Sequence, residues 1–120
     1  AADGKKLAFI AGGETVVHLT GHGLGGRNQE IALAAAENLS GLSNAAVISV
    51  GSDGTDGPTD AAGGYADGDT QAALASAGWS IADALRQNDS YHALLSVNGL
   101  VHTGPTGTNV NDVAIALVGE

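Results

Sequence analysis

The sequence predicts an α/β fold, in which a sheet of mixed parallel and antiparallel strands carries an N-terminal β-hairpin and packed helices in a Rossmann-like arrangement. Three observations predict this class. Apolar runs of strand length recur along the chain, segments rich in helix formers separate them, and glycine-rich loops follow the strands. With 120 residues, no internal repeat and no linker, the sequence predicts one domain over residues 1–120 that has its own core.

The chain is expected to open with a hairpin. Residues 7–11 (LAFIA) and 14–20 (ETVVHLT) are β-rich runs. Gly12 and Gly13 join them, and such a pair accepts the positive φ angles of a two-residue turn. A glycine loop at 21–26 (GHGLGG) follows the second run.

Helix and strand signals continue in alternation. The strong helix formers of 27–39 predict a helix with one apolar stripe, formed by Ile31, Ala35 and Leu39. The unbroken apolar run at 45–50 predicts a strand that is covered on both faces. Capping residues Asp69, Ser80 and either Asp89 or Ser90 predict short helices at 70–77, 81–87 and 91–97. Strands are predicted at 100–103 and 112–118.

Three glycine-rich loops, at 21–26, 51–64 and 104–111, each come directly after a predicted strand. If those strands run in the same direction, all three loops lie at one end of the sheet. Ligands of open α/β sheets bind at the carboxyl ends of the strands. The sequence therefore predicts a binding site where these loops meet.

Composition excludes several classes of partner. Four Lys and Arg against 13 Asp and Glu give a formal charge of -9, which repels the backbone of nucleic acid and anionic lipid. No stretch approaches the ~18 apolar residues of a membrane span, and no typical signal peptide is present, so a cytoplasmic location is expected. The absence of cysteine excludes disulfides and thiolate chemistry. The oligomeric state stays open, with a homo-oligomer among the options.

The stretch GHGLGGRN can form an anion site. Backbone N–H groups at a helix start, the helix dipole and the guanidinium of Arg27 together suit a phosphate or carboxylate. In the alternative interpretation, the glycines only turn the chain and Arg27 caps a neighbouring carbonyl. An arginine is disfavoured at a helix N-terminus, so an anionic partner is expected, either a ligand or Asp53 or Asp56.

Residues 51–64 (GSDGTDGPTDAAGG) place Asp53, Asp56 and Asp60 directly after an apolar strand. The spacing excludes an EF-hand loop, whose ligands alternate and end in a distant Glu. A solvated turn explains the residue types but not three carboxylates beside a predicted anion site. A carboxylate there can accept a hydroxyl proton or hold Mg²⁺ on a nucleotide, which are two tasks of phosphoryl transfer.

The third loop, TGPTGTNVND at 103–112, is rich in hydroxyl and amide groups. These groups suit a polyhydroxy acid or a phosphate, although Thr and Asn also serve ordinary turns. His18 and His102 lie in predicted strands and are expected to be packing or edge residues. No residue is assigned to a metal site, because no His, Asp or Glu pair has zinc-binding spacing.

Five motifs in order resemble the MOFRL domain, the C-terminal domain of the glycerate 2-kinase family, some of whose members carry the label hydroxypyruvate reductase. The motifs are GGET at 12–15, GGRNQE at 25–30, SDGTDGPTDAAG at 52–63, NDSY at 88–91 and TGPTGTNVND at 103–112. The resemblance covers nearly the whole chain. His22 and Leu24 stand where the family often has basic residues.

The resemblance implies an ATP-dependent kinase that phosphorylates the 2-hydroxyl of D-glycerate, or of a similar small hydroxy acid, with ATP and Mg²⁺. It implies that Arg27 contacts the substrate or the transferring phosphate and that Asp53 orients or deprotonates the hydroxyl. The motifs also supply the predicted substrate-binding residues, which are Gly25, Gly26, Asn28, Asp56, Thr106 and Asn109. Asp56 and Asp60 are then supporting or structural.

The family's nucleotide site and catalytic lysine belong to a large N-terminal domain that this sequence lacks, so the isolated chain is expected to be inactive. Two alternatives stay open. One is a non-catalytic module that binds a small anionic metabolite or a partner protein through the same loops. The other is a hydroxypyruvate reductase, against which GHGLGG lacks the full Rossmann context of a dinucleotide site.

Overall fold

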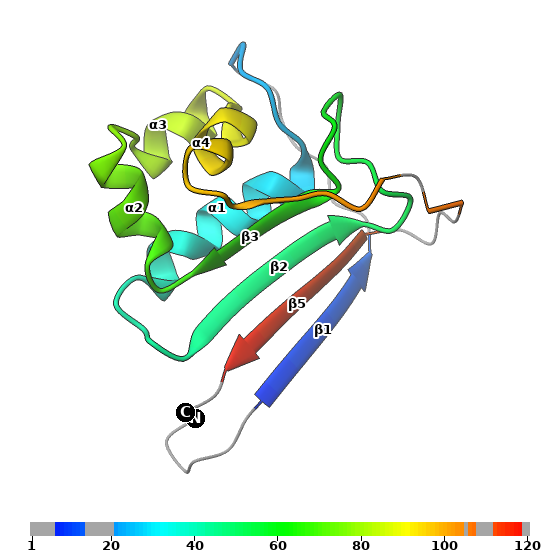
Figure 1. Ribbon diagram of the computed structural model, residues 1–120, viewed down its shortest axis with the longest axis horizontal. Coiled ribbons are helices and arrows are strands. Elements are labelled where there is room, and N and C mark those ends of the chain that lie inside the picture. Colours follow the sequence, from blue (N-terminus) through cyan, green and yellow to red (C-terminus); the bar gives the residue numbers. More distant parts are fainter. Residues whose placement is uncertain (1–6, 14–20, 105, 108–111, 119–120) are drawn as a thin grey trace.

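The computed structural model describes residues 7–13, 21–104, 106–107 and 112–118, which form one sheet with its helices on one side (Figure 1). The sheet has five strands in the order β1-β5-β2-β3-β4. They are β1 (Leu7–Gly13), β2 (Ala45–Gly51), β3 (Gly63–Asp67), β4 (Leu100–Val101) and β5 (Asp112–Val118). Each neighbouring pair in this order is antiparallel.

The α/β class is confirmed, but parallel pairing is absent from the described strands, so the prediction of a mixed, Rossmann-like sheet is wrong there. The alternation of strands and helices along the sequence suggested parallel neighbours. In the structure β5 lies between β1 and β2, and β3 lies between β2 and β4. Each inserted strand runs opposite to both of its neighbours, so that no two strands of the same direction touch.

The predicted N-terminal hairpin turn is also wrong. Gly12 and Gly13 continue β1 and pair with Val113 and Asp112 of β5. Residues 14–20, which were expected to form the second strand of the hairpin, lie outside the described residues. A glycine pair permits a tight turn without requiring one, and here the long-range pairing with β5 sets the path of the chain.

Helix α1 (Arg27–Leu39) has the predicted bounds but buries a different face. Its buried residues are Asn28, Gln29, Ala32, Leu33 and Ala36. The predicted stripe of Ile31, Ala35 and Leu39 is only half-buried. The apolar periodicity of the sequence indicated the wrong face of α1. The first two residues of the buried face, Asn28 and Gln29, are polar and are buried through hydrogen bonds.

Three short helices follow the third strand. They are α2 (Thr70–Ser76), α3 (Ile81–Arg86) and α4 (Ser90–Ser96). The Ser80 hydroxyl caps α3 as predicted, since it accepts a hydrogen bond from Asp83 N at 3.3 Å. Asp69 and Asp89 occupy the N-cap positions of α2 and α4 without a side-chain cap bond. Gly78 has φ of +87° just after α2, which is the left-handed conformation of a C-terminal glycine.

Strand β3 was not predicted, because its sequence GGYAD has two glycines and no run of β-branched residues. Both glycines are explained by the close approach of neighbouring segments of the chain. A Cβ on Gly63 would lie 1.8 Å from Ser49 O, and one on Gly64 would lie 2.8 Å from Leu94 Cδ1. Tertiary packing therefore selects a strand that local propensity disfavours.

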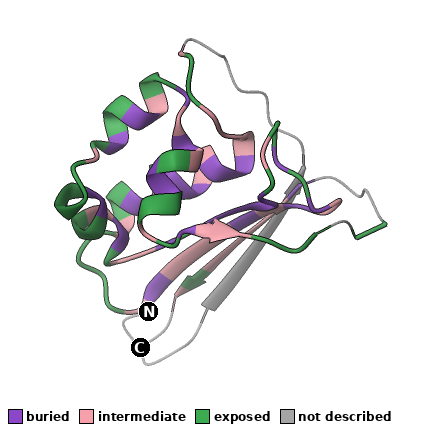
Figure 2. Cartoon of the chain, turned by 45° about the horizontal axis from the view of Figure 1, so that its top comes forward, coloured by how far each residue is buried: buried purple, intermediate pink, exposed green. Residues whose placement is uncertain are grey.

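The core lies between the helices and one face of the sheet. Figure 2 shows buried residues where α1 meets the strands. The buried core cluster is Ala32, Leu33, Ala36, Ala66, Leu74, Ile81, Ala84, Ala93 and Leu94. Helix α1 packs on β3 and β2, whereas β5 and β1 extend beyond the helices (Figure 1). The small alanine side chains of this cluster allow the helices to approach the sheet closely.

One end of the sheet gathers the glycine-rich loops, and we call it the rim. It is the end at which Gly13 pairs with Asp112, Asp112 with Gly51, and Gly63 with Val101. β2 and β4 run in the same direction without being neighbours, so the chain leaves both strands at the rim. The predicted convergence of the second and third loops is thereby achieved in an antiparallel sheet.

Candidate functional site

The second and third loops touch at the rim. The Thr106 hydroxyl donates a hydrogen bond to Ser52 O at 2.6 Å. Gly54, with φ of +87°, passes so close to Gly104 that a Cβ on Gly54 would lie 2.1 Å from Gly104 O. A side chain at position 54 would be strained and would also separate the loops, so glycine is required there.

The Asp56 carboxylate caps the N-terminus of α1. Asp56 is 3% exposed. Its Oδ1 accepts hydrogen bonds from Asn28 N at 3.0 Å and Asn28 Nδ2 at 3.1 Å, and its Oδ2 accepts one from Gln29 N at 2.8 Å. Burial raises the pKa of Asp56, and the hydrogen bonds from Asn28 and Gln29 oppose that rise. The helix start that the sequence predicted as an anion site is thus bound to an anion of the protein itself.

The same network ties α1 to the sheet. Ser49 Oγ of β2 donates a hydrogen bond to Asn28 Oδ1 at 2.7 Å, and Gln29 Nε2 donates one to Thr59 Oγ1 at 2.9 Å. Asn28 and Gln29 are 1% and 0% exposed. Polar groups buried to this degree cost free energy unless they are hydrogen-bonded, and these bonds offset most of that cost. Asn28, Gln29 and Asp56 therefore join α1, β2 and the loop at 51–64 into one unit.

Arg27 begins α1 and reaches the first residue of β5. Its Nε and Nη2 donate hydrogen bonds to Oδ2 and Oδ1 of Asp112, the second at 3.1 Å. The Asp112 side chain is 11% exposed and that of Arg27 is 37% exposed. The structure pairs Arg27 with Asp112, which was not among the expected anionic partners, namely a ligand, Asp53 or Asp56. A two-pronged pair of this kind fixes the plane of the guanidinium.

Asp53 lies at the surface of the rim in a local turn. Its Oδ1 accepts hydrogen bonds from Thr55 N at 3.0 Å and Thr55 Oγ1 at 2.9 Å. These bonds, the backbone one first, lower the pKa of Asp53, and the nearby charge of Arg27 lowers it further. Asp53 is therefore an ionised carboxylate at neutral pH, within electrostatic reach of the guanidinium.

The glycine loop at 21–26 is fastened to the NDSY motif. Gly21 N donates to Asn88 Oδ1 at 2.9 Å, and Leu24 N donates to Asp89 Oδ1 at 3.0 Å. Asn88 is 7% exposed and has φ of +54°. Cβ atoms on the loop glycines would lie within 2.2–2.4 Å of atoms of Gln87, Asp89, Ser90 and Asp56. The glycines thus allow close packing of the loop. This agrees better with the interpretation in which they only turn the chain than with a phosphate-binding loop.

A second polar cluster lies beside the rim. Tyr91 OH donates a hydrogen bond to Asp60 Oδ1 at 2.9 Å, and His102 Nε2 lies 3.5 Å from the same oxygen. The bond from Tyr91 lowers the pKa of Asp60 and raises that of Tyr91. His102 is exposed just beyond β4, which ends two residues earlier than predicted. Asp60 therefore anchors the end of the second loop.

The predicted site residues fall into three groups. Arg27, Asp53 and Thr106 come together at the rim. Asn28 and Asp56 are buried beneath it, and Gly25 and Gly26 pack against Ser90 and Asp56. Asn109 and His18 lie outside the described residues.

The sequence assigned no role to Asp112 or Asn88 and only a helix-capping role to Asp89, although all three lie in the quoted motifs. An acidic residue that starts a strand directly after a polar loop was the available signal for Asp112.

Two further properties bear on function. Among the described residues, no group of three or more His, Asp or Glu side chains is arranged to hold a metal ion. No helix in the described part of the chain is long and apolar enough to cross a membrane.

Comparison with proteins of known sequence identifies the relatives. The chain is 55% identical to a D-glycerate 2-kinase of Thermotoga maritima over 114 residues, which are 95% of this chain and 27% of that protein. It is 50% identical to a glycerate 2-kinase of Pyrococcus horikoshii over 113 residues, which are 93% of this chain and 26% of that protein. The chain thus spans about a quarter of the length of these relatives.

The fold is shared with solved structures. A crystal structure of glycerate kinase from Thermotoga maritima matches 92% of this chain and 27% of its own with a TM-score of 0.90 and 56% identity. A crystal structure of a protein from Pyrococcus horikoshii matches with a TM-score of 0.90 and 49% identity, over 94% of this chain and 26% of its own. The sequence profile of the MOFRL family matches residues 7–112. The chain therefore belongs to the MOFRL family.

Proposed function

We propose that the chain is the C-terminal, substrate-side domain of a glycerate 2-kinase, which transfers the γ-phosphoryl group of ATP to the 2-hydroxyl of D-glycerate. The observation that carries this proposal is the 55% identity to a D-glycerate 2-kinase over 95% of the chain. The rim supports it, because the guanidinium of Arg27, which Asp112 holds, acts electrostatically on the ionised carboxylate of Asp53 there. A larger N-terminal domain would complete the cleft.

Arg27 stabilises the negative charge of the transferring phosphoryl group in this proposal. Phosphoryl transfer passes through a transition state with charge spread over the phosphoryl oxygens, so a preplaced cation lowers its free energy. Asp112 holds the guanidinium by two hydrogen bonds. This arrangement reduces the reorganisation that Arg27 needs when the reaction begins.

Asp53 orients the attacking hydroxyl. Because hydrogen bonds from Thr55 lower its pKa, Asp53 stays ionised and is a weak base. A weak base suits a loose transition state with little early proton transfer. The 2-hydroxyl oxygen forms the new bond to phosphorus as the bond from phosphorus to the leaving oxygen of ADP breaks. The hydroxyl proton passes to the Asp53 carboxylate late in the reaction.

The other predicted residues divide by position. In this proposal the substrate is bound by Thr106, Asn109, Gly25 and Gly26. Asn28 and Asp56 support the rim from below, since their side chains are buried and hydrogen-bonded to one another. When bound, MgATP supplies the phosphoryl group. The larger domain would hold most of the nucleotide and the ion. The proposed enzyme acts in the cytoplasm.

Replacement of Arg27 tests the proposal. Arg27→Ala in the full-length enzyme should lower kcat for D-glycerate and MgATP on the order of 10³-fold, because an arginine at the transferring group contributes about that much. The matched control is Arg86→Ala, since Arg86 is exposed on α3 and pairs with Asp83. The control should retain kcat. Near-normal turnover in Arg27→Ala, with the fold intact by circular dichroism, would rule out the role.

A further inference from the structure

The sheet has one face that no helix of the described chain covers. Ser49 of β2 points to the helices, because it bonds Asn28 of α1. Side chains alternate along a strand, so Ile48 and Val50 point to the opposite face. Direct cross-strand partners share a face, which places Ile115 and Tyr65 beside Ile48. We call this surface the open face, and define it by Ile48, Val50, Tyr65, Val113, Ile115 and Leu117.

The open face is largely apolar and is partly exposed along its length. The Ile and Val residues are half-buried, while Tyr65 and Leu117 are 38% and 49% exposed. Among the described strand residues of this face the charged side chain is Asp67, which lies at its pocket end, pairs with Ala46 and accepts a hydrogen bond from Tyr65 OH. Contiguous apolar surface of this kind marks an interaction site more often than it marks free surface.

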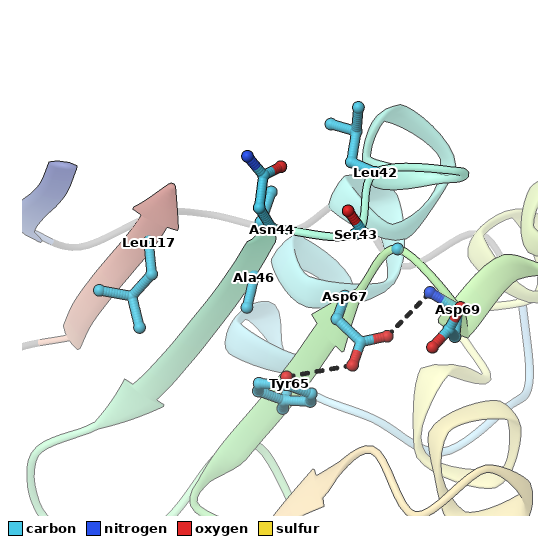
Figure 3. Close-up of a pocket in the computed structure, with 10 residues that line it drawn as sticks. Leu42, Ser43, Asn44, Ala46, Tyr65, Asp67, Asp69 and Leu117 are labelled. Atoms are coloured by element: carbon cyan, nitrogen blue, oxygen red, sulfur yellow. Dashed lines mark hydrogen bonds between the residues drawn. The ribbon is translucent and has the colours of Figure 1, made fainter. Parts of the chain in front are cut away.

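A pocket continues the open face at the end of the sheet opposite the rim (Figure 3). Its volume is about 240 Å³, and Leu42, Tyr65 and Leu117 line it together with Asp67 and Asp69. Three of the four large hydrophobic side chains that are exposed in the described structure therefore gather here. In the close-up, Leu117 comes from β5, Tyr65 from β3 and Leu42 from the loop after α1.

The position of β1 indicates what covers this surface. Leu7 pairs with Val118, and Val118 pairs with Ala45, a residue of the pocket. Polypeptide that precedes β1 in a longer protein thus reaches the sheet at the pocket end. The proposed catalytic residues lie at the rim, about 20 Å away along seven-residue strands that rise about 3.4 Å per residue. An N-terminal domain that joins at one end and acts at the other must extend along the sheet.

We propose that the open face and its pocket are the docking surface for the larger N-terminal domain of the enzyme. This inference rests on the proposed function, since about three quarters of the length of the relatives lies outside the matched region. The partner surface is apolar opposite Ile48 and Ile115. It carries a basic residue opposite Asp67 and Asp69, because a buried or half-buried carboxylate needs a compensating charge.

Thiol labelling tests the docking surface. The chain has no cysteine, so each introduced cysteine is unique within it. Leu42→Cys and Leu117→Cys lie at the pocket, and Leu95→Cys on α4 is the matched control. The exposures of the three native side chains are nearly equal, at 48%, 49% and 51%. In the full-length enzyme, maleimide should react with positions 42 and 117 at least tenfold more slowly than with position 95, as measured by peptide mass spectrometry.

Two results would overturn the proposal. Equal labelling rates at the three positions would show that the open face is exposed in the full-length enzyme. Protection of positions 42 and 117 that disappears on dilution, as the enzyme dissociates to monomers, would assign the face to a second copy. Neither result depends on catalysis, so the kinase assay of unlabelled enzyme tests the proposed function separately.

Discussion

The guanidinium of Arg27 and the carboxylate of Asp112 form a two-pronged salt bridge between residues that are 85 positions apart in the sequence. The pair joins the first turn of α1 to the first residue of β5 at the rim. Asp112 thereby satisfies a cation that the helix dipole disfavours. It also sets the direction in which the guanidinium faces the neighbouring loops.

Asp112→Asn should impair catalysis more than folding. The amide keeps the shape of the carboxylate but loses its charge and one acceptor, so the guanidinium is held less firmly. We expect kcat of the full-length enzyme to fall by about tenfold, since misplacement of a catalytic group is costly. Asp112→Glu should recover part of kcat, because it restores an anionic acceptor. Unchanged kcat in Asp112→Asn would contradict a positioning role.

Asp56→Ala should destabilise the protein strongly. The change leaves Asn28 N, Asn28 Nδ2 and Gln29 N without their acceptor in a buried site. Each unsatisfied buried donor costs about 1–3 kcal/mol, so a loss of about 3 kcal/mol or more in the free energy of unfolding is expected. Asp53→Ala, three residues away and at the surface, is the control and should cost clearly less than Asp56→Ala. Urea denaturation compares the two, and equal losses would contradict the capping role.

The acidic loop should titrate in a defined order. Burial raises the pKa of Asp56 above the ordinary value of 3.8, whereas hydrogen bonds from Thr55 and Tyr91 lower the pKa values of Asp53 and Asp60. Carboxyl-detected NMR should therefore show Asp56 deprotonating last of the three. A midpoint for Asp56 below those of Asp53 and Asp60 would contradict this order.

The same shifts predict opposite effects of pH on stability. Between pH 3.8 and the folded pKa of Asp56, the native state binds more protons at this site than the unfolded state. The contribution of Asp56 to the free energy of unfolding therefore falls as pH rises through that window. Asp53 and Asp60 stabilise the folded state above pH 3.8, and this stabilisation is lost as pH falls through their lowered pKa values. Denaturation of Asp56→Asn against pH should lack the first effect and keep the second.

Local signals predicted the elements well and their pairing poorly. The bounds of α1 and of β5 match the expectation because apolar periodicity and glycine boundaries are local properties. The use of Gly12 and Gly13 in β1, and the existence of β3, depend on neighbours that are distant in the sequence. The sequence could not show these pairings because the local preferences of glycine disfavour a strand, and only contacts with distant residues select one here.

The sequence indicated which residue types gather at the candidate site but not which of them contact one another. Glycine-rich loops with Arg27 and Asp53 indicated one end of the sheet, and the structure brings the second and third of these loops into contact there. The separation of a surface carboxylate, Asp53, from a buried one, Asp56, needed coordinates, because both occur in the same D-G context. The partner of Arg27 also needed them, since Asp112 is reached only through the order of the strands.

A size exchange between Gly25 and Ser90 tests the packing of the glycine loop. A Cβ on Gly25 would lie 2.2 Å from Ser90 Oγ but 3.4 Å from Ser90 Cβ. Gly25→Ala should therefore lower the free energy of unfolding by about 1–3 kcal/mol through overpacking. Ser90→Ala should cost little, because its buried hydroxyl has no hydrogen-bond partner in the described structure.

The double variant Gly25→Ala with Ser90→Ala should recover much of the loss, since it removes the clashing oxygen and leaves only a tight contact of 3.3 Å with Ser90 N and one of 3.4 Å with Ser90 Cβ. Gly41→Ala is the matched control. Gly41 has φ of +85° and no atom within 4 Å of its added Cβ, so its cost is backbone strain alone. Addition of Ser90→Ala to Gly41→Ala should give no recovery. Equal recovery in both backgrounds, measured by thermal and urea denaturation, would show that Ser90→Ala stabilises the fold in general and that the loop glycine is not selected by this contact.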